Sequence, residues 1–185
     1  MRLKMSQELE ILQMVTTRLA EAGIPYMVTG SIAMNYYAVP RMTRDIDIVI
    51  ELSEEDVEET VRLFQREFYV DREMVQQAVK DRLMFNVIHN AYMIKVDLIV
   101  RKNSDYRKEE FSRRRTVKVD GHAFHIVAPE DLILSKLDWA KDSHSEIQLG
   151  DVRNLLAAVP QLDHDYLIGW ADRLGLRELY QEVTA

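Results

Sequence analysis

The apolar positions of the chain recur with two periods, one typical of helices and one typical of strands. Spacings of three or four residues predict helices over 6–22, 53–67, 72–80 and 129–141, with two or three more between 146 and 183. Alternating or continuous runs of β-branched and other apolar residues predict strands over 26–29, 45–50, 83–89, 92–100, 116–119 and 123–127. The pattern therefore predicts a mixed α+β fold with a helical C-terminal part.

Residues that favour turns and helix ends separate these segments. Ser31 is placed to cap a short helix that follows strand 26–29 and ends before Pro40. Asn90–Ala91 and Asp120–Gly121 each suit a tight turn between two strands. Scattered glycines and prolines form no linker, and there is no internal repeat. We expect one compact unit with a core of residues 1–128 and a helical part of residues 129–185 packed on it.

The composition excludes several classes of protein. Because the chain has no cysteine, it has no disulfide, no thiolate zinc site and no cysteine nucleophile. Its formal net charge of −7 argues against a protein that coats nucleic acid through many phosphate contacts. The N-terminal residues do not resemble a signal peptide, and no run approaches the ~18 apolar residues of a membrane span. These features predict a soluble, cytoplasmic protein without membrane contact.

Three aspartates stand in otherwise apolar strand segments. Residues two apart on a strand share a face, so Asp45 and Asp47 are predicted to lie side by side, opposite the buried Ile46. Asp97 is the only acid of the strand predicted over 92–100. Each aspartate alone could have an ordinary role: Asp45 at the strand start, Asp47 facing solvent, and Asp97 paired with Lys95 or Arg44. Together, three neighbouring carboxylates predict a site for Mg²⁺ or Mn²⁺ that binds substrate phosphates.

Gly30 and Ser31 add a second feature between strand 26–29 and the short helix. A glycine lets backbone N–H groups approach an anion, and the helix N-terminus and the Ser31 hydroxyl add donors. A plain turn with a capping serine is the other interpretation of this pair.

The combined pattern resembles the DNA polymerase β-like nucleotidyltransferase superfamily. Its signature is similar to Gly30–Ser31, then Asp45-x-Asp47 on a strand, then a distant Asp97. The run from Arg41 to Asp47 is similar to AbiEii-type toxin nucleotidyltransferases and related small stand-alone proteins. The resemblance covers about residues 24–158 and implies a polymerase β-like core sheet with flanking helices.

The resemblance also implies roles for individual residues. Asp45 and Asp47 would hold two divalent ions that bridge the nucleotide phosphates, and Asp97 would share one ion and help activate the attacking hydroxyl. Gly30 and Ser31 would contact the triphosphate. The nucleotide would be a nucleoside triphosphate (NTP).

Lys136 lies in an apolar helical stretch, and Asp151 follows it at the spacing that the AbiEii-like pattern implies. Lys136 would contact a phosphate with Asp151 orienting it. The alternatives are a lysine that extends to solvent and an aspartate that caps a helix. On either interpretation of Lys136, the Lys136→Ala substitution is expected to cost little stability. If Lys136 contacts a phosphate, the substitution also lowers transfer or nucleotide affinity. Asn154 departs from the pattern, since a second acid is common there.

Other side chains are assigned more simply. Arg44 is a candidate for binding the nucleotide, because it flanks the acid pair. The run Arg113–Arg115 suits a solvated strand edge, with an RNA-contacting patch as the alternative. Trp139 and the tyrosines near residue 36 are expected in the core. No histidine has metal-ligand spacing.

These features together predict a Mg²⁺-dependent nucleotidyltransferase. It would move a nucleoside monophosphate from an NTP to an acceptor hydroxyl on a protein, an RNA or a small molecule. One alternative is a non-catalytic nucleotide-binding or partner-binding subunit of a toxin–antitoxin-like pair, with a partner protein. The other is a metal-dependent phosphodiesterase.

Overall fold

One mixed sheet forms the centre of the computed structural model, which describes residues 6–40 and 45–184. Within these residues the sheet has seven strands in the order β3-β4-β5-β2-β1-β7-β6. The strands are β1 (Tyr26–Thr29), β2 (Ile46–Ile50), β3 (Phe68–Tyr69), β4 (Met84–His89), β5 (Lys95–Val100), β6 (Arg115–Val119) and β7 (His122–Ile126). At the centre, β2 runs antiparallel to β1 and parallel to β5, and β1 runs parallel to β7.

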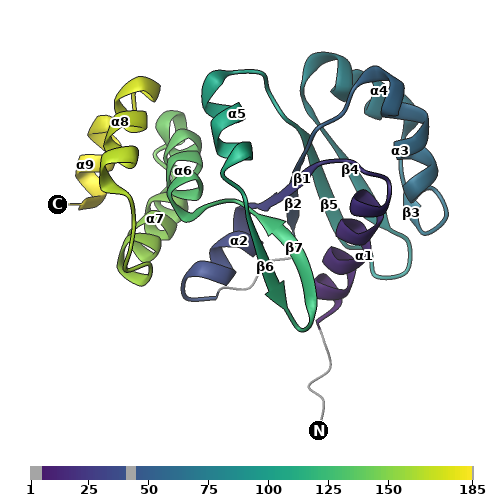
Figure 1. The fold of residues 1–185 in the computed structure, drawn as a ribbon, viewed down its shortest axis with the longest axis horizontal. Coiled ribbons are helices and arrows are strands. Elements are labelled where there is room, and N and C mark those ends of the chain that lie inside the picture. Colours follow the sequence, from purple (N-terminus) through teal and green to yellow (C-terminus); the bar gives the residue numbers. More distant parts are fainter. Residues whose placement is uncertain (1–5, 41–44, 185) are drawn as a thin grey trace, which may run out of the picture.

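Helices pack on the sheet, and further helices lie beyond one end of it (Figure 1). They are α1 (Gln7–Glu21), α2 (Gly30–Tyr37), α3 (Val57–Phe64), α4 (Arg72–Asp81), α5 (Asp105–Ser112), α6 (Pro129–Ser143), α7 (Glu146–Ala158), α8 (His164–Leu174) and α9 (Arg177–Thr184). Figure 1 shows α6 to α9 gathered at one end of the molecule and α3 and α4 at the other. The predicted α+β class with a helical C-terminal part is confirmed. The division after residue 128 stays a prediction.

None of the helices in the described ranges combines the length and apolar character needed to cross a lipid bilayer.

Residues at the ends of two predicted segments adopt the conformations that the sequence predicts for them. The Ser6 hydroxyl accepts the Leu9 N–H at the start of α1, at 3.2 Å. Asp120 and Gly121 have φ of 47° and 85°, the two positive angles of a type I′ turn, which joins β6 to β7 as predicted.

Three local predictions are wrong. Thr29, rather than Ser31, stands at the N-cap of α2, so Ser31 lies in the first helical turn. The helix predicted to reach residue 67 ends at Phe64. The connection from β4 to β5 is longer than the predicted turn, with Met93 at φ 53°. Helix α5 lies in a stretch for which the spacing of apolar residues predicts no element, because its buried residues include Glu110 and form no apolar stripe.

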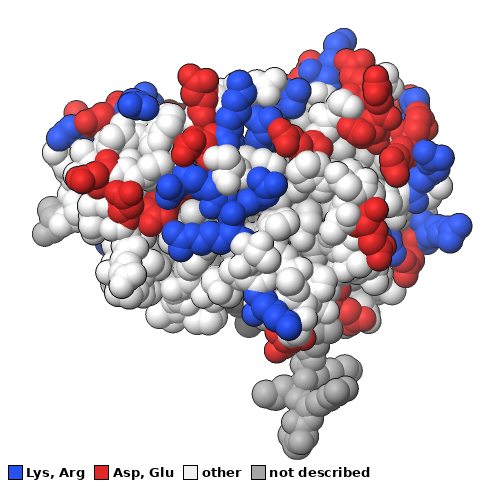
Figure 2. Space-filling model, in the orientation of Figure 1, with Lys and Arg blue, Asp and Glu red and all other residues white. Residues whose placement is uncertain are grey.

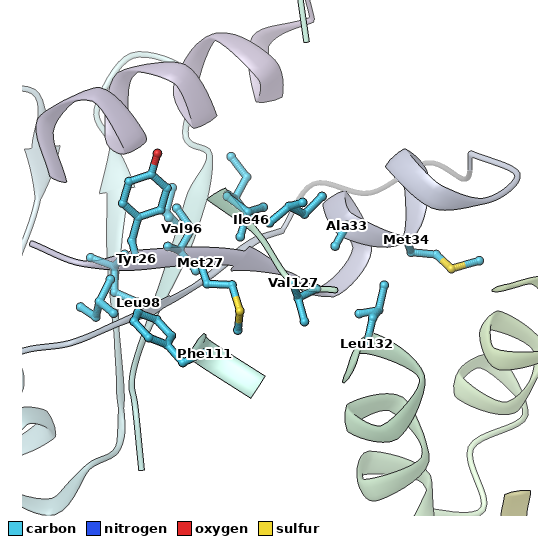
Figure 3. Close-up of a cluster of buried hydrophobic side chains, with 14 of the residues drawn as sticks. Tyr26, Met27, Ala33, Met34, Ile46, Val96, Leu98, Phe111, Val127 and Leu132 are labelled. Atoms are coloured by element: carbon cyan, nitrogen blue, oxygen red, sulfur yellow. The ribbon is translucent and has the colours of Figure 1, made fainter. Parts of the chain in front are cut away.

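The two faces of the sheet have different neighbours. In Figure 3, Tyr26 points from β1 toward α1, whereas Met27 points to the other side, toward Phe111 of α5. In β2 the buried side chains of Ile46, Ile48 and Ile50 alternate with Asp47 and Val49, which are only partly buried. The apolar face of β2 therefore stabilises the fold, and the opposite face presents the site described next.

Candidate functional site

The site is organised around a row of three side chains on the central strands. Thr29 of β1 pairs with Asp47 of β2, and Asp47 pairs with Asp97 of β5. Directly paired residues on neighbouring strands share a face, so the two carboxylates lie side by side. Asp97 is buried, with 6% of its surface exposed. The structure thus brings together the two aspartates that the sequence placed on separate strands.

The third aspartate, Asp45, lies two residues before Asp47 in the chain. Asp45 precedes β2, and its side chain is 64% exposed. The ammonium of Lys95 bridges the acids: Nζ lies 2.8 Å from Oδ2 of Asp97 and 3.9 Å from Oδ1 of Asp45. The hydrogen bond to Asp97 raises the pKa of Lys95. One positive charge therefore offsets part of the negative charge of the row, as the simpler interpretation of Asp97 expected.

The compensation by Lys95 leaves part of the row unsatisfied. Oδ1 of Asp97 is buried and has no hydrogen-bond partner among the described residues. Burial raises the pKa of Asp47, and the charges of Asp97 and Asp45 raise it further, while Lys95 and Lys136 act in the opposite direction. A buried oxygen without a donor and a carboxylate that resists ionisation are both features that a bound cation would relieve. In residues 6–40 and 45–184, no three acidic or histidine side chains are already arranged around a common metal position.

Gly30 packs directly against Asp47. Its φ is +61°, in the left-handed region, and a Cβ built on it would lie 2.7 Å from Cγ of Asp47 and nearer still to Oδ2. Both the backbone angle and the contact therefore require glycine. The absence of a side chain at Gly30 is what lets the Asp47 carboxylate lie beside the start of α2.

We expect Gly30→Ala to lower both stability and activity. Gly23 is the matched control, because its φ is +69° but a Cβ there would meet nothing within 4 Å. Strain at one such backbone position costs about 1–3 kcal/mol, so both variants should lose some thermal stability in a calorimetric scan. Only Gly30→Ala should also displace Asp47 and lose activity. Equal activity of the two variants would contradict the proposed contact.

A cavity opens beside the row and is walled by α2 and α6. Its volume is about 210 Å³, and it is lined by Thr29, Gly30, Ser31, Asp47, Ile99, Leu132, Ser135, Lys136, Trp139 and Gln148. Ser31 and the first N–H groups of α2 therefore reach the same space as Asp47, although Ser31 is not the helix cap. Helix N-termini attract anions through these N–H groups.

Lys136 enters this cavity from α6 and is held by α7. Its Nζ lies 2.7 Å from Oδ2 of Asp151 and 3.1 Å from Oε1 of Gln148. The Lys136 and Asp151 side chains are 6% and 5% exposed. Lys136 is therefore not a lysine that extends to solvent, and Asp151 lies inside α7 rather than at its N-cap. The predicted pairing of these two residues is present, and their burial changes the expected cost of substituting Lys136.

The sequence also offers Arg44 as a site candidate, and Asn154 departs from the AbiEii-like pattern. Arg44, the candidate for nucleotide binding, lies outside the described residues. Asn154 of α7 is exposed.

The arginine run has a structural role that its sequence did not indicate. Figure 2 shows lysine and arginine side chains gathered over α5 and the start of β6, the region that contains Arg113–Arg115. Arg113 is partly buried and paired with two acids: Nε lies 2.9 Å from Asp131, and a terminal nitrogen lies 3.2 Å from Glu130. Both acids lie in the first turn of α6. Arg113, the residue that follows α5, thus joins the end of α5 to the helix that carries Lys136.

Sequence reasoning missed two residues of the cavity wall. Trp139 was expected in the core but is 72% exposed. It follows Lys136 by three positions on α6, so the two lie on neighbouring parts of the helix surface. Gln148 was not singled out, and only the packing of α7 on α6 shows its contact with Lys136.

The fold and the sequence were compared with known proteins. The structure is similar to an antigenic nucleotidyltransferase-like protein from Paracoccidioides brasiliensis, with a TM-score of 0.54, 20% identity, and coverage of 84% of this chain and 77% of that one. It is also similar to ANT(2")-Ia in complex with adenylyl-2"-tobramycin, with a TM-score of 0.56, 13% identity, and coverage of 98% and 100%.

The lincosamide antibiotic adenylyltransferase LnuA, in its lincomycin-bound structure, is similar too, with a TM-score of 0.53, 12% identity, and coverage of 84% and 98%. At these identities the likeness establishes the fold. A search of curated proteins found no match.

The sequence comparison establishes the family. Residues 8–167 match the family described as "Nucleotidyl transferase of unknown function (DUF2204)". This match spans most of the chain and includes the carboxylate row, the Gly30–Ser31 turn and Lys136. The chain therefore belongs to this family and is a nucleotidyltransferase.

Proposed function

We propose that the protein transfers a nucleoside monophosphate from an NTP to an acceptor hydroxyl and releases pyrophosphate, with Mg²⁺ or Mn²⁺ as cofactor. The observation that carries this proposal is the pairing of Asp47 with Asp97 beside a cavity that Gly30, Ser31 and Lys136 also line. Acidic groups for a cation and donors for phosphates thus border one space. An NTP bound with a divalent ion needs both.

The residues of the row suit a divalent ion in their donor chemistry. Mg²⁺ prefers carboxylate oxygens, and the unpartnered Oδ1 of Asp97 and the raised pKa of Asp47 indicate negative charge that the fold itself does not fully compensate. Asp45, Asp47 and Asp97 would hold the ion. When bound, it would neutralise phosphate charge and polarise the reacting phosphoryl group. The contact between Lys95 and Asp97 would have to change when the ion binds.

The other residues of the site would bind and orient the substrates. The first N–H groups of α2 and the Ser31 hydroxyl would donate to the triphosphate, and the missing side chain of Gly30 leaves room for Asp47 beside them. Lys136 presents an ammonium to a phosphate, and its pairing with Asp151 fixes the direction of that ammonium. Asp97 would help to activate the attacking hydroxyl by accepting its proton. The oxygen–phosphorus bond forms at the acceptor as the bond to pyrophosphate breaks.

The test is transfer of label in a cell extract. NTP labelled at the α-phosphorus should label an acceptor when Mg²⁺ is present and should not do so with EDTA, whereas label at the γ-phosphorus should leave as pyrophosphate. The acceptor can be a protein, an RNA or a small molecule, and its sensitivity to protease or ribonuclease identifies the class. Asp97→Asn is the control for endogenous transferases.

The same experiment separates the alternatives. Release of labelled free monophosphate without an acceptor would indicate hydrolysis of the NTP in place of transfer. A phosphodiesterase would instead cleave a labelled oligonucleotide in the presence of Mg²⁺ without any NTP. NTP binding without any turnover would indicate a non-catalytic subunit, including one that acts with a partner protein in a toxin–antitoxin-like pair. The AbiEii-type assignment stays a prediction. Because two similar structures are described with tobramycin and lincomycin, small hydroxylated compounds belong among the acceptors tested.

A further inference from the structure

A second and larger cavity adjoins the phosphate-binding one. Its volume is about 320 Å³, and the two cavities share Thr29, Ile99, Ser135 and Trp139 as a common wall. Small-molecule sites are typically cavities of about 300–1,000 Å³. The larger cavity alone reaches this size, while the smaller one holds the polar groups assigned to phosphates. An elongated ligand bound across the common wall would occupy both.

The lining of the larger cavity favours an uncharged group. Val49 of β2 and Ile99 of β5 are paired on the face of the sheet that borders this cavity, and they supply its apolar surface. The charged lining residues are three cationic and three acidic: Arg101, Lys102, Arg107, Glu110, Asp138 and Asp142. Several of them pair within the protein.

Arg107 contacts Glu110 at 2.9 Å and Asp138 at 3.1 Å, and Arg101 pairs with Glu51 outside the cavity. The walls therefore offer neither a net positive field for phosphates nor a net negative one for a polyamine.

Trp139 supplies a flat aromatic surface at the junction of the two cavities. Its 72% exposure is unusual for so large an apolar ring. It lies about one helical turn beyond Lys136 on α6, and it lines both cavities. A phosphate at Lys136 and a ring at Trp139 would be separated by about one turn. In an NTP a short sugar joins the phosphates to an uncharged, flat heterocycle.

We propose that the larger cavity binds the nucleobase of the NTP and that Trp139 is its stacking surface. This inference rests on the proposed function, because it assumes that the triphosphate occupies the Gly30–Lys136 cavity. Trp139 would then determine how strongly the nucleoside contributes to binding, without contacting the reacting phosphorus. Stacking of a base on an aromatic ring contributes an amount that corresponds to about tenfold or more in affinity.

The chain permits a direct spectroscopic test. It has two tryptophans. Trp170 of α8 packs against Tyr106 of α5 and Tyr166 of α8, and its ring centroid lies 5.1 Å and 6.4 Å from theirs. In the Trp170→Phe variant all tryptophan emission comes from Trp139. With Mg²⁺ present, NTP should quench this emission, whereas inorganic tripolyphosphate should bind and compete with NTP without quenching it.

A second measurement uses affinity. In calorimetry Trp139→Ala should weaken NTP binding about tenfold and leave tripolyphosphate binding unchanged. Trp139→Phe should weaken NTP binding less, because a phenyl ring can still stack on the base. Because Trp139 is exposed, neither substitution should change the melting temperature appreciably.

If NTP binds with parental affinity but does not change the Trp139 emission, this inference is overturned and the proposed function stays intact. Emission that responds only when an acceptor is added to the NTP complex would have the same consequence. Failure of NTP and tripolyphosphate to bind at all would overturn both proposals.

Discussion

Asp47→Asn is expected to lower the transfer rate about 10³-fold or more and, without metal, to make the protein more stable. The loss follows because the variant removes one of the carboxylates proposed to hold the divalent ion, an interaction worth several kcal/mol in the transition state. The gain follows because the ionised Asp47 lies half-buried beside Asp97. We expect a gain of about 1 kcal/mol, or a Tm about 2–4 °C higher in EDTA for a chain of this length.

The stability difference should depend on pH in a defined direction. Because the folded protein raises the pKa of Asp47, the folded state binds this proton more tightly than the unfolded state does. Ionised Asp47 therefore costs stability above its folded pKa, and that cost disappears as the pH falls through it. The Tm advantage of Asp47→Asn in EDTA should be largest near neutral pH and shrink on acidification.

Asp45→Asn is the matched control for this effect. Asp45 is also a proposed ligand, but its side chain is 64% exposed, so its charge is well solvated. Asp45→Asn should lower activity and leave the metal-free Tm almost unchanged. A lower Tm for Asp47→Asn in EDTA, or parental activity in Mg²⁺, would show that the carboxylate row has a structural role only.

Lys136→Met is expected to lower stability by roughly 3–5 kcal/mol and to abolish tight NTP binding. The substitution leaves the buried carboxylate of Asp151 without the ammonium 2.7 Å away, and a buried charge that loses its partner is costly. The sequence alone had suggested that replacing Lys136 would cost little. The structure corrects this because the lysine is paired and buried, rather than extended to solvent.

A double variant separates the two effects of Lys136. Replacing both residues, as Lys136→Met with Asp151→Leu, removes the ion pair together with its desolvation cost and should restore most of the lost Tm. NTP binding should remain lost, because the phosphate would still lack its ammonium. Calorimetric titration of the folded double variant measures this directly. Parental NTP affinity in that variant would show that Lys136 serves the packing of α6 on α7 and does not bind nucleotide.

The arrangement of the carboxylates was predictable from the sequence because strand geometry is periodic. Alternation along residues 45–50 separates Asp47 from the buried isoleucines, and an isolated acid in a β-branched run predicts Asp97 on the inner part of a sheet. Asp120–Gly121 likewise predicted its hairpin from local backbone preference. These features depend on residues close together in the chain, so local rules are sufficient to predict them.

The sequence by itself determined the residue types of the site and their order: a glycine–serine turn, two aspartates on one strand, a third on another, and a lysine on a later helix. Only the tertiary structure decided that Asp47 pairs with Asp97, that Gly30 packs against Asp47, and that Lys136 is buried against Asp151. It also left Trp139 exposed at the junction of two cavities. The reason is that burial depends on which elements pack over a side chain, and those elements come from distant parts of the chain.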